Sequence, residues 1–250
     1  MTDETPRPSR RKLLAGAALI AGAGAWPVRG EEQAAMKEST KHVVLLGDSI
    51  FDNKAYVGSG PDVIAQLRAA LPQGSIATLA AVDGSTTADV RQQLGNLPKD
   101  ATHLIVSAGG NDALEQRGVL QEWSLSIAGA LDKLSKIKSS FGKSYAAMLN
   151  AVTARGLPTA VCTIYDARYQ DLELRRIAAA GLTVFNDVIL REAFARALPV
   201  IDLRIMFDDD ADYANDIEPS VKGGEKIARA IAALVETHDF TRRRSEIYVE

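Results

Sequence analysis

Cysteine is nearly absent from this chain: Cys162 is the only one among 250 residues. A single cysteine excludes an internal disulfide and any zinc site that needs several thiolates. Because Cys162 lies in the apolar run Thr159–Ile164, we expect a buried thiol in a strand rather than a reactive one. The stability of the fold must then come from its hydrophobic core, and no cofactor is expected.

Excess charge and long apolar runs are also scarce. The formal net charge is -3, which gives no electrostatic reason to expect nucleic acid as a partner. After the first thirty residues no apolar run is long enough to cross a membrane, so we expect no transmembrane anchor in the mature form. The hydrophobic share of 46% in 250 residues is instead ordinary for one globular domain.

The first thirty residues follow a different pattern from the rest. The pair Arg10-Arg11 opens a basic segment, and the weakly apolar run Ala15–Ala25 follows it and ends in small residues. This order is typical of a signal peptide, and paired arginines before two leucines resemble the twin-arginine class. We therefore predict a signal peptide and linker over residues 1–30, export by the twin-arginine machinery, and a periplasmic or secreted location. The alternatives are a helical or disordered arm, or a cytoplasmic protein with a misplaced start codon.

From residue 41 onward, short apolar runs alternate with segments of helical periodicity. The runs have the length and the nearly continuous apolar character of buried parallel strands. Five strands are predicted, at His42–Leu46, Ile76–Val82, Leu104–Ser107, Thr159–Ile164 and Val200–Leu203. Strands that alternate with helices predict an α/β fold, a three-layer α/β/α sandwich around a five-stranded parallel sheet.

The helices between these strands are harder to delimit. Four are predicted at Val63–Leu71, Thr86–Leu94, Asp171–Leu198 and Lys226–Thr237. We expect two more between residues 114 and 155, separated near Phe141-Gly142, and a possible break at Gly181. The domain is expected to span residues 41–237, and residues 238–250 to form a charged, loose tail.

Polar residues and glycines follow the predicted strands. Ser49, Gly84, Asn111 and Asp166 each come shortly after a strand ends. The carboxyl ends of parallel strands meet at one edge of the sheet, where open α/β sheets bind their ligands. We therefore expect these four residues to cluster at that edge.

The motifs at these positions resemble a known family. They are Gly-Asp-Ser-Ile at Gly47–Ile50, a glycine-containing loop at Val82–Thr87, Gly-Gly-Asn-Asp at Gly109–Asp112, and Pro219-Ser220 ahead of Gly223-Gly224. In this order, at the ends of successive strands, they resemble the GDSL/SGNH hydrolases over residues 41–237. The resemblance implies a flavodoxin-like sandwich of the SGNH-hydrolase type and a serine esterase or lipase. The predicted location outside the cytoplasm suggests small-molecule, lipid or glycan esters as its substrates.

The chemistry of such a site can be argued from the residues. A serine in a strand-to-helix turn, here Ser49, presents its hydroxyl for attack on an ester carbonyl. Negative charge then develops on the carbonyl oxygen and needs fixed donors. The Ser49 N–H, the Gly84 N–H and the Asn111 side-chain amide are the candidate donors. The alternative for each residue alone is a structural role in a turn or a helix cap.

The motif that should supply the base departs from the family pattern. Family members carry Asp-x-x-His before Pro-Ser, whereas this chain has Asn215 and Glu218 at those positions. A solvated glutamate is a weak base at neutral pH. Burial, or the charge of Asp216 and the acidic run Asp208–Asp212, would raise the pKa of Glu218 into a useful range. Asn215 would then hold Glu218 in place by hydrogen bonding.

The three histidines do not offer a replacement. His42 and His103 begin strands and His238 follows the last helix, which places them roughly 17–27 Å from Ser49, at ~3.3 Å per strand residue and ~1.5 Å per helix residue. We expect all three at the surface, so Glu218 is the remaining candidate for the base. The alternative is that Glu218 is a surface carboxylate capping the last helix of an impaired enzyme.

Two functions therefore remain open. The first is an exported serine ester hydrolase that works through a Ser49 acyl-enzyme. The second is a catalytically impaired binding protein that retains the pocket for an acylated or glycan ligand. The acidic run Asp208–Asp212 has the alternate spacing of a calcium loop but lacks its glycine and its closing glutamate, so a solvated acidic loop is favoured there.

Overall fold

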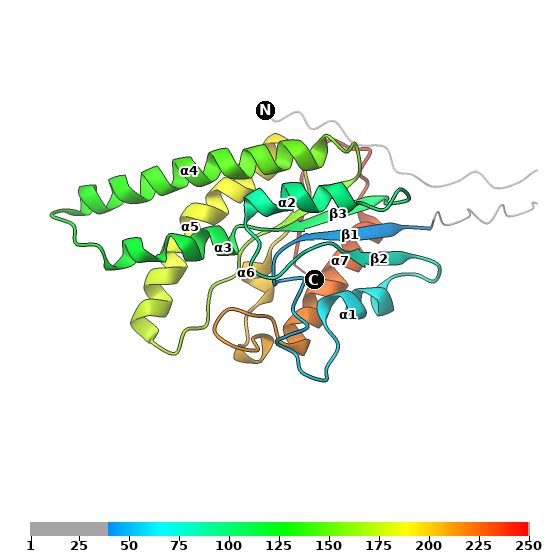
Figure 1. Ribbon diagram of the computed structural model, residues 1–250, viewed down its shortest axis with the longest axis horizontal. Coiled ribbons are helices and arrows are strands. Elements are labelled where there is room, and N and C mark those ends of the chain that lie inside the picture. Colours follow the sequence, from blue (N-terminus) through cyan, green and yellow to red (C-terminus); the bar gives the residue numbers. More distant parts are fainter. Residues whose placement is uncertain (1–39, 250) are drawn as a thin grey trace, which may run out of the picture. The chain divides into compact units, whose positions relative to one another are not determined.

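The computed structural model describes residues 40–249 (Figure 1). These residues form one compact unit. The predicted signal peptide and linker over residues 1–30 lie outside the described residues. Within them, no helix combines the length and the apolar character that a membrane span requires.

A parallel sheet lies at the centre of the fold. Its strands are β1 (His42–Gly47), β2 (Ile76–Leu79), β3 (His103–Ser107), β4 (Thr159–Cys162), β5 (Val200–Ile201) and β6 (Ile247–Tyr248). They are arranged in the order β2-β1-β3-β4-β5-β6, and every pairing is parallel. The predicted three-layer sandwich and its parallel sheet are confirmed, but the number of strands is six rather than five.

The sixth strand comes from the C-terminal segment that we expected to be loose. Strand β6 pairs with β5 through hydrogen bonds from Val200 N–H to the Glu246 carbonyl and from Asp202 N–H to the Tyr248 carbonyl. The edge of β5 would otherwise leave its backbone groups without partners. A two-residue pairing at a sheet edge depends on tertiary contact, which a sequence pattern does not reveal.

Helices cover both faces of the sheet (Figure 1). The α-helices are α1 (Val63–Ala70), α2 (Thr87–Gln93), α3 (Gly110–Glu115), α4 (Ile127–Thr153), α5 (Leu172–Ala195), α6 (Leu203–Met206) and α7 (Val221–Thr237). Short 3-10 helices lie at η1 (Leu94–Asn96), η2 (Arg117–Gln121) and η3 (Asp210–Asp212). Helices α1 and α7 pack on one face with Val43 and Leu45, while α2, α4 and α5 pack on the other with Val44 and Leu46. Successive side chains of a strand point to opposite faces, so β1 contributes to both cores.

The two longest helices run without the interruptions that we predicted. Helix α4 passes through Gly142, and α5 passes through Gly181. The chain instead leaves α-helical geometry between α3 and α4, in the segment that contains the 3-10 helix η2. Buried residues begin at Phe141 in α4 and at Phe185 in α5. The change in sequence pattern therefore marks where each helix reaches the core, not where it breaks.

Candidate active site

Ser49 lies two residues beyond Gly47, the last residue of β1. The backbone geometry at Gly47 is one that only glycine can adopt. Gly47 has a φ of 130°, and a Cβ on it would lie 1.7 Å from the Ser107 carbonyl oxygen on β3. Only glycine allows this approach and this conformation. The following turn is closed by hydrogen bonds from Phe51 N–H to the Asp48 carbonyl and from Ile50 N–H to Asp48 Oδ1. Ser49 is thereby fixed at the carboxyl edge of the sheet, with 8% of its surface exposed.

Glu218 lies opposite this serine. Ser49 Oγ donates a hydrogen bond to Glu218 Oε1 at 3.1 Å, and both residues line the same cavity. Glu218 is only 5% exposed, and its Oε2 has no hydrogen-bond partner among the described residues. Ser220, not Glu218, caps helix α7. The structure therefore pairs the predicted nucleophile with a buried carboxylate.

The backbone of the Glu218 loop is held by local hydrogen bonds. Asn215 Oδ1 accepts from the N–H groups of Ile217 and Glu218, at 2.9 and 3.0 Å. The Glu218 carbonyl accepts from Ala214 N–H at 2.8 Å. Asn215 therefore positions the main chain at Glu218 and does not contact its carboxylate.

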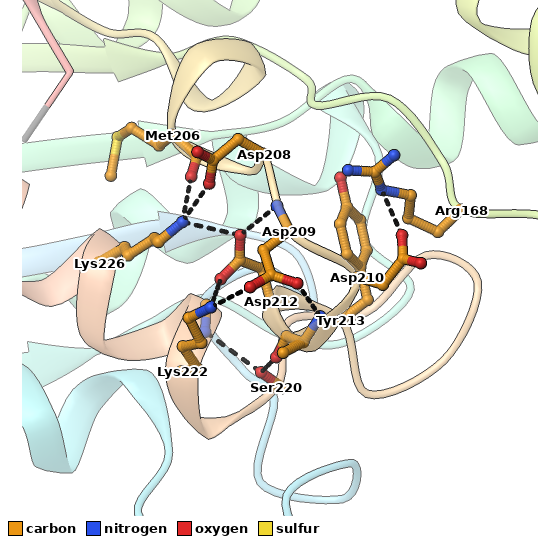
Figure 2. A network of polar contacts seen from close by, with 12 residues as sticks. Arg168, Met206, Asp208, Asp209, Asp210, Asp212, Tyr213, Ser220, Lys222 and Lys226 are labelled. Carbon is orange, nitrogen blue, oxygen red and sulfur yellow. Dashed lines mark hydrogen bonds and ion pairs between the residues drawn. The ribbon is translucent and has the colours of Figure 1, made fainter.

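The acidic run before this loop is tied to helix α7 (Figure 2). Lys226 contacts Asp208 at 2.6 Å and Asp212 at 2.8 Å, and Lys222 contacts Asp209 at 2.6 Å. Asp212 is fully buried, so the expectation of a solvated loop fails at this residue. A carboxylate without solvent must be paired, and the two lysines of α7 meet that need. No cluster that could hold a metal ion occurs in the part of the chain that the structure describes.

The loop after this run is also anchored to the sheet edge by an aromatic residue. The Ser220 N–H donates to the Asp212 carbonyl at 2.8 Å, which joins the acidic run to the segment that carries Glu218. Buried Tyr165 donates its hydroxyl hydrogen to the Ile217 carbonyl at 2.7 Å and stacks on Phe207. We did not predict a role for Tyr165 from the sequence. The one indication of such a role was its position shortly after β4.

The carboxyl groups of the site have shifted pKa values. Burial raises the pKa of Glu218 above its ordinary value of 4.5, the charge of Asp83 adds to this, and the hydrogen bond from Ser49 opposes it. Burial is also the main cause that raises the pKa of Asp48 to about 8, with contributions from Glu218 and Asp112. The expected rise at Glu218 is present, but its causes are burial and Asp83 rather than Asp216 or the acidic run.

The predicted oxyanion donors do not all reach the cavity. Asn111 lines it, and one of its side-chain N–H groups donates to the Ser85 carbonyl at 2.9 Å. An amide carries two such N–H groups, so a second remains. Gly84 has a φ of 80°, is exposed, and is not among the residues that line the cavity; nor is Asp166. The structure brings together Ser49, Asn111 and Glu218.

The histidines lie away from this cavity, but they are not surface residues. His42, His103 and His238 are only 6%, 9% and 7% exposed, and none of them lines the cavity. His42 lies 3.1 Å from Asp100, and His238 lies 2.8 Å from Glu246. Burial lowers the pKa of His103 to about 4. The expectation of surface positions was wrong because other segments pack on these side chains: Phe240 contacts the rings of His103 and His238, and Thr78 hydrogen-bonds to His42.

The cavity itself is large and mostly apolar. Its volume is about 720 Å³, and it extends from Ser49 and Glu218 between α3, η2, α4 and α5. Asp48 also faces it, a residue to which the sequence analysis gave no role although it precedes Ser49 in the first motif. The site thus combines a serine, a carboxylate, an amide and a space for an apolar ligand.

Comparison with known proteins agrees with this geometry. Residues 45–226 match the GDSL-like Lipase/Acylhydrolase family. A search of the curated proteins gave no match.

Solved structures share the fold at low sequence identity. An extracellular lipase from Streptomyces rimosus is 18% identical, with a TM-score of 0.58 over 80% of this chain and 100% of its own. An acetyl xylan esterase is 16% identical, with a TM-score of 0.58 over 78% and 99%. A lipase/acylhydrolase from Enterococcus faecalis is 18% identical, with a TM-score of 0.55 over 78% and 95%. Because the family model matches residues 45–226, which are most of the chain, the chain belongs to the GDSL-like lipase/acylhydrolase family.

Proposed function

We propose that this protein is a serine ester hydrolase in which Ser49 is the nucleophile and Glu218 the general base. The observation that carries the proposal is the hydrogen bond of 3.1 Å from Ser49 Oγ to Glu218 Oε1 in the cavity that both residues line. A base must lie within hydrogen-bond reach of the proton that it abstracts, and Glu218 meets this condition. Membership of the family supports ester hydrolysis as the reaction class.

The proposed reaction has two steps. Ser49 Oγ attacks the ester carbonyl carbon while its proton passes to Glu218, and the tetrahedral intermediate then collapses. The alcohol departs with the proton from Glu218, which leaves an acyl group on Ser49. Water attacks this acyl-enzyme, again giving its proton to Glu218, and the acid product leaves as the serine regains its hydrogen.

Burial supports glutamate in the role that histidine usually has. A carboxylate of ordinary pKa is too weakly basic to accept a serine proton efficiently near neutral pH. Burial raises the pKa of Glu218, which brings its basicity closer to that of a histidine. Its Oε2, which has no partner among the described residues, leaves the carboxylate without a competing donor that would lower that basicity.

The oxyanion would be stabilised by donors around Ser49. We propose the Ser49 N–H, the side-chain amide of Asn111 and the Gly84 N–H for this role. The position of Asn111 in the cavity lining supports its assignment. Gly84 follows β2 at the same edge of the sheet but lies outside the lining, so its assignment rests on its place in the motif.

A binding protein for an acylated or glycan ligand is the second candidate. The observation that favours it is the hydrogen bonding of Asn215, which is directed to backbone N–H groups and not to the Glu218 carboxylate. No side chain then orients the base as an aspartate would orient histidine. Such a protein would bind an ester without turning it over.

The test compares hydrolysis of p-nitrophenyl butyrate by the wild type, Ser49→Ala and Glu218→Gln at neutral pH. We expect Ser49→Ala to abolish turnover and Glu218→Gln to lower kcat about 100- to 10,000-fold, the usual contribution of a general base. Glu225→Gln, the same change at an exposed residue of α7, is the matched control and should match the wild type. Turnover that survives Ser49→Ala would contradict the proposal, and absence of turnover in the wild type would favour the binding protein.

We also propose that the mature protein acts in the periplasm or outside the cell, and that the twin-arginine machinery exports it. The support is the order of the basic pair Arg10-Arg11, the apolar run and the small residues near position 25. Replacing both arginines with lysine should leave the uncleaved protein in the cytoplasmic fraction. An unchanged distribution between fractions would contradict export by this route.

A further inference from the structure

Much of the cavity wall is formed by helix segments that contain no fully buried residue. No residue of α4 before Phe141 is buried, and no residue of α5 before Phe185 is buried. These segments nevertheless carry large apolar side chains, and several of those line the cavity. The apolar residues from these helices and from α3 and η2 include Leu114, Leu120, Leu134, Ile137, Ile177 and Leu182.

The same cavity holds the reacting groups. Ser49, Asn111 and Glu218 line it together with apolar side chains from α3, η2, α4 and α5. A volume of about 720 Å³ is within the ~300–1,000 Å³ of sites that enclose a drug-sized ligand, and it far exceeds what an acetyl group occupies. An apolar cavity whose lining includes a nucleophilic serine fits an aliphatic chain bonded to the attacked carbonyl.

Gly181 contributes to this space in an unusual way. It lies in the interior of α5 and lines the cavity, and its φ is not in the left-handed region. A Cβ there would have one neighbour within 4 Å, the Leu120 Cδ2 at 3.9 Å. Neither backbone conformation nor close packing therefore requires glycine, although glycine is unfavourable inside a helix. What it provides is open volume between α5 and η2.

We propose that this cavity holds the acyl group of the substrate, that this group is a medium or long aliphatic chain, and that Gly181 keeps the space for it open. The inference rests on the proposed function, because it places the chain relative to Ser49. It makes Gly181 a specificity-determining residue and predicts that short acyl groups are poor substrates.

The experiment measures kcat/KM for p-nitrophenyl acetate, butyrate, octanoate and decanoate. We expect the wild type to gain about fourfold per added methylene until the cavity is filled. Gly181→Phe should lower kcat/KM for octanoate and decanoate by at least about 20-fold while acetate changes less than about threefold. The matched control is Ala180→Phe, which adds the same side chain at an exposed position of α5 outside the cavity lining and should follow the wild type.

Two outcomes would overturn the proposal. One is a wild-type preference for acetate, and the other is an equal loss for all chain lengths in Gly181→Phe. Titration of the Ser49→Ala variant with methyl decanoate separates this proposal from the proposed function. Saturable binding that disappears in the Ser49→Ala, Gly181→Phe double variant would support the acyl cavity even if the wild type lacked turnover, and absence of binding would contradict it.

Discussion

Helix α4 packs its C-terminal half against the sheet, whereas its N-terminal half, Ile127–Ser140, holds no buried residue. From Phe141 onward, buried side chains recur at helical spacing, at Tyr145, Met148, Leu149 and Val152. In the first half the apolar side chains Leu134 and Ile137 line the cavity, and Ile137 also packs against the edge of the core. Helix α5 shows the same division. Helices α4 and α5 are therefore each continuous. The C-terminal part of each helix packs in the core, and the N-terminal part lines the cavity.

The difference teaches what a change of sequence pattern means in this fold. We predicted helix breaks near Phe141-Gly142 and at Gly181, and the structure places the change from cavity wall to core at or close to both points. Before these points the apolar side chains line the cavity, and after them buried side chains pack in the core against the sheet. A mixed pattern within one long helix thus indicates a change of surroundings.

The largest effect is expected on the free energy of unfolding, which substitutions in the two halves of α4 should lower by different amounts. Leu149 is fully buried in the core, so Leu149→Ala should lower the free energy of unfolding by about 2–5 kcal/mol. Leu134→Ala makes the same change in the cavity wall, where the side chain is only partly buried, and should cost less than about 1 kcal/mol. Urea unfolding of both variants measures the difference, and equal losses would break the comparison.

A pH-dependent effect is expected at Asp48, which directly follows β1 and lines the cavity. Its pKa is raised to about 8 in the folded protein, so the folded state binds a proton that the unfolded chain loses near pH 4. The resulting stability is present below about pH 4 and is lost as pH rises toward about 8. An asparagine side chain does not titrate, so the Asp48→Asn variant should lack this pH dependence of stability.

The Asp48→Asn variant should therefore match the wild type near pH 4 and exceed its stability near pH 8 by on the order of a few kcal/mol, at 1.36 kcal/mol per pKa unit. Denaturant unfolding at both pH values provides the measurement. A stability difference that is independent of pH would show that this carboxyl group is ionised in the fold. Asp132→Asn, the same change at an exposed aspartate of α4, is the matched control.

The smallest effect tests whether the helices are continuous. Gly142→Ala and Gly181→Ala each place a Cβ with one neighbour, at 4.0 and 3.9 Å. Inside a helix, alanine is favoured over glycine by about 0.8–1 kcal/mol, so both variants should melt a few degrees higher than the wild type. A lower melting temperature of either variant would contradict a continuous helix at that glycine and would favour the break that we predicted from the sequence.

The fold could be predicted largely because its strands are short apolar runs with a fixed place in the alternation. The strand-end rule and the family motifs also identified Ser49, Asn111 and Glu218 correctly as neighbours of one cavity. Strand β6 was missed because its pairing is only two residues long, and the burial of the histidines was missed because distant segments cover them. Gly84 lies outside the cavity lining, since its position depends on how the loop after β2 turns.

The central claim is that Glu218 accepts the proton of Ser49. The most direct measurement is kcat/KM for p-nitrophenyl decanoate and butyrate as a function of pH, in the wild type and in Glu218→Gln. Because burial raises the pKa of Glu218, the wild-type rate should rise with pH through an apparent pKa above 4.5, and this step should be absent in Glu218→Gln together with most of the activity. The same profile and the same rate in Glu218→Gln would contradict the account.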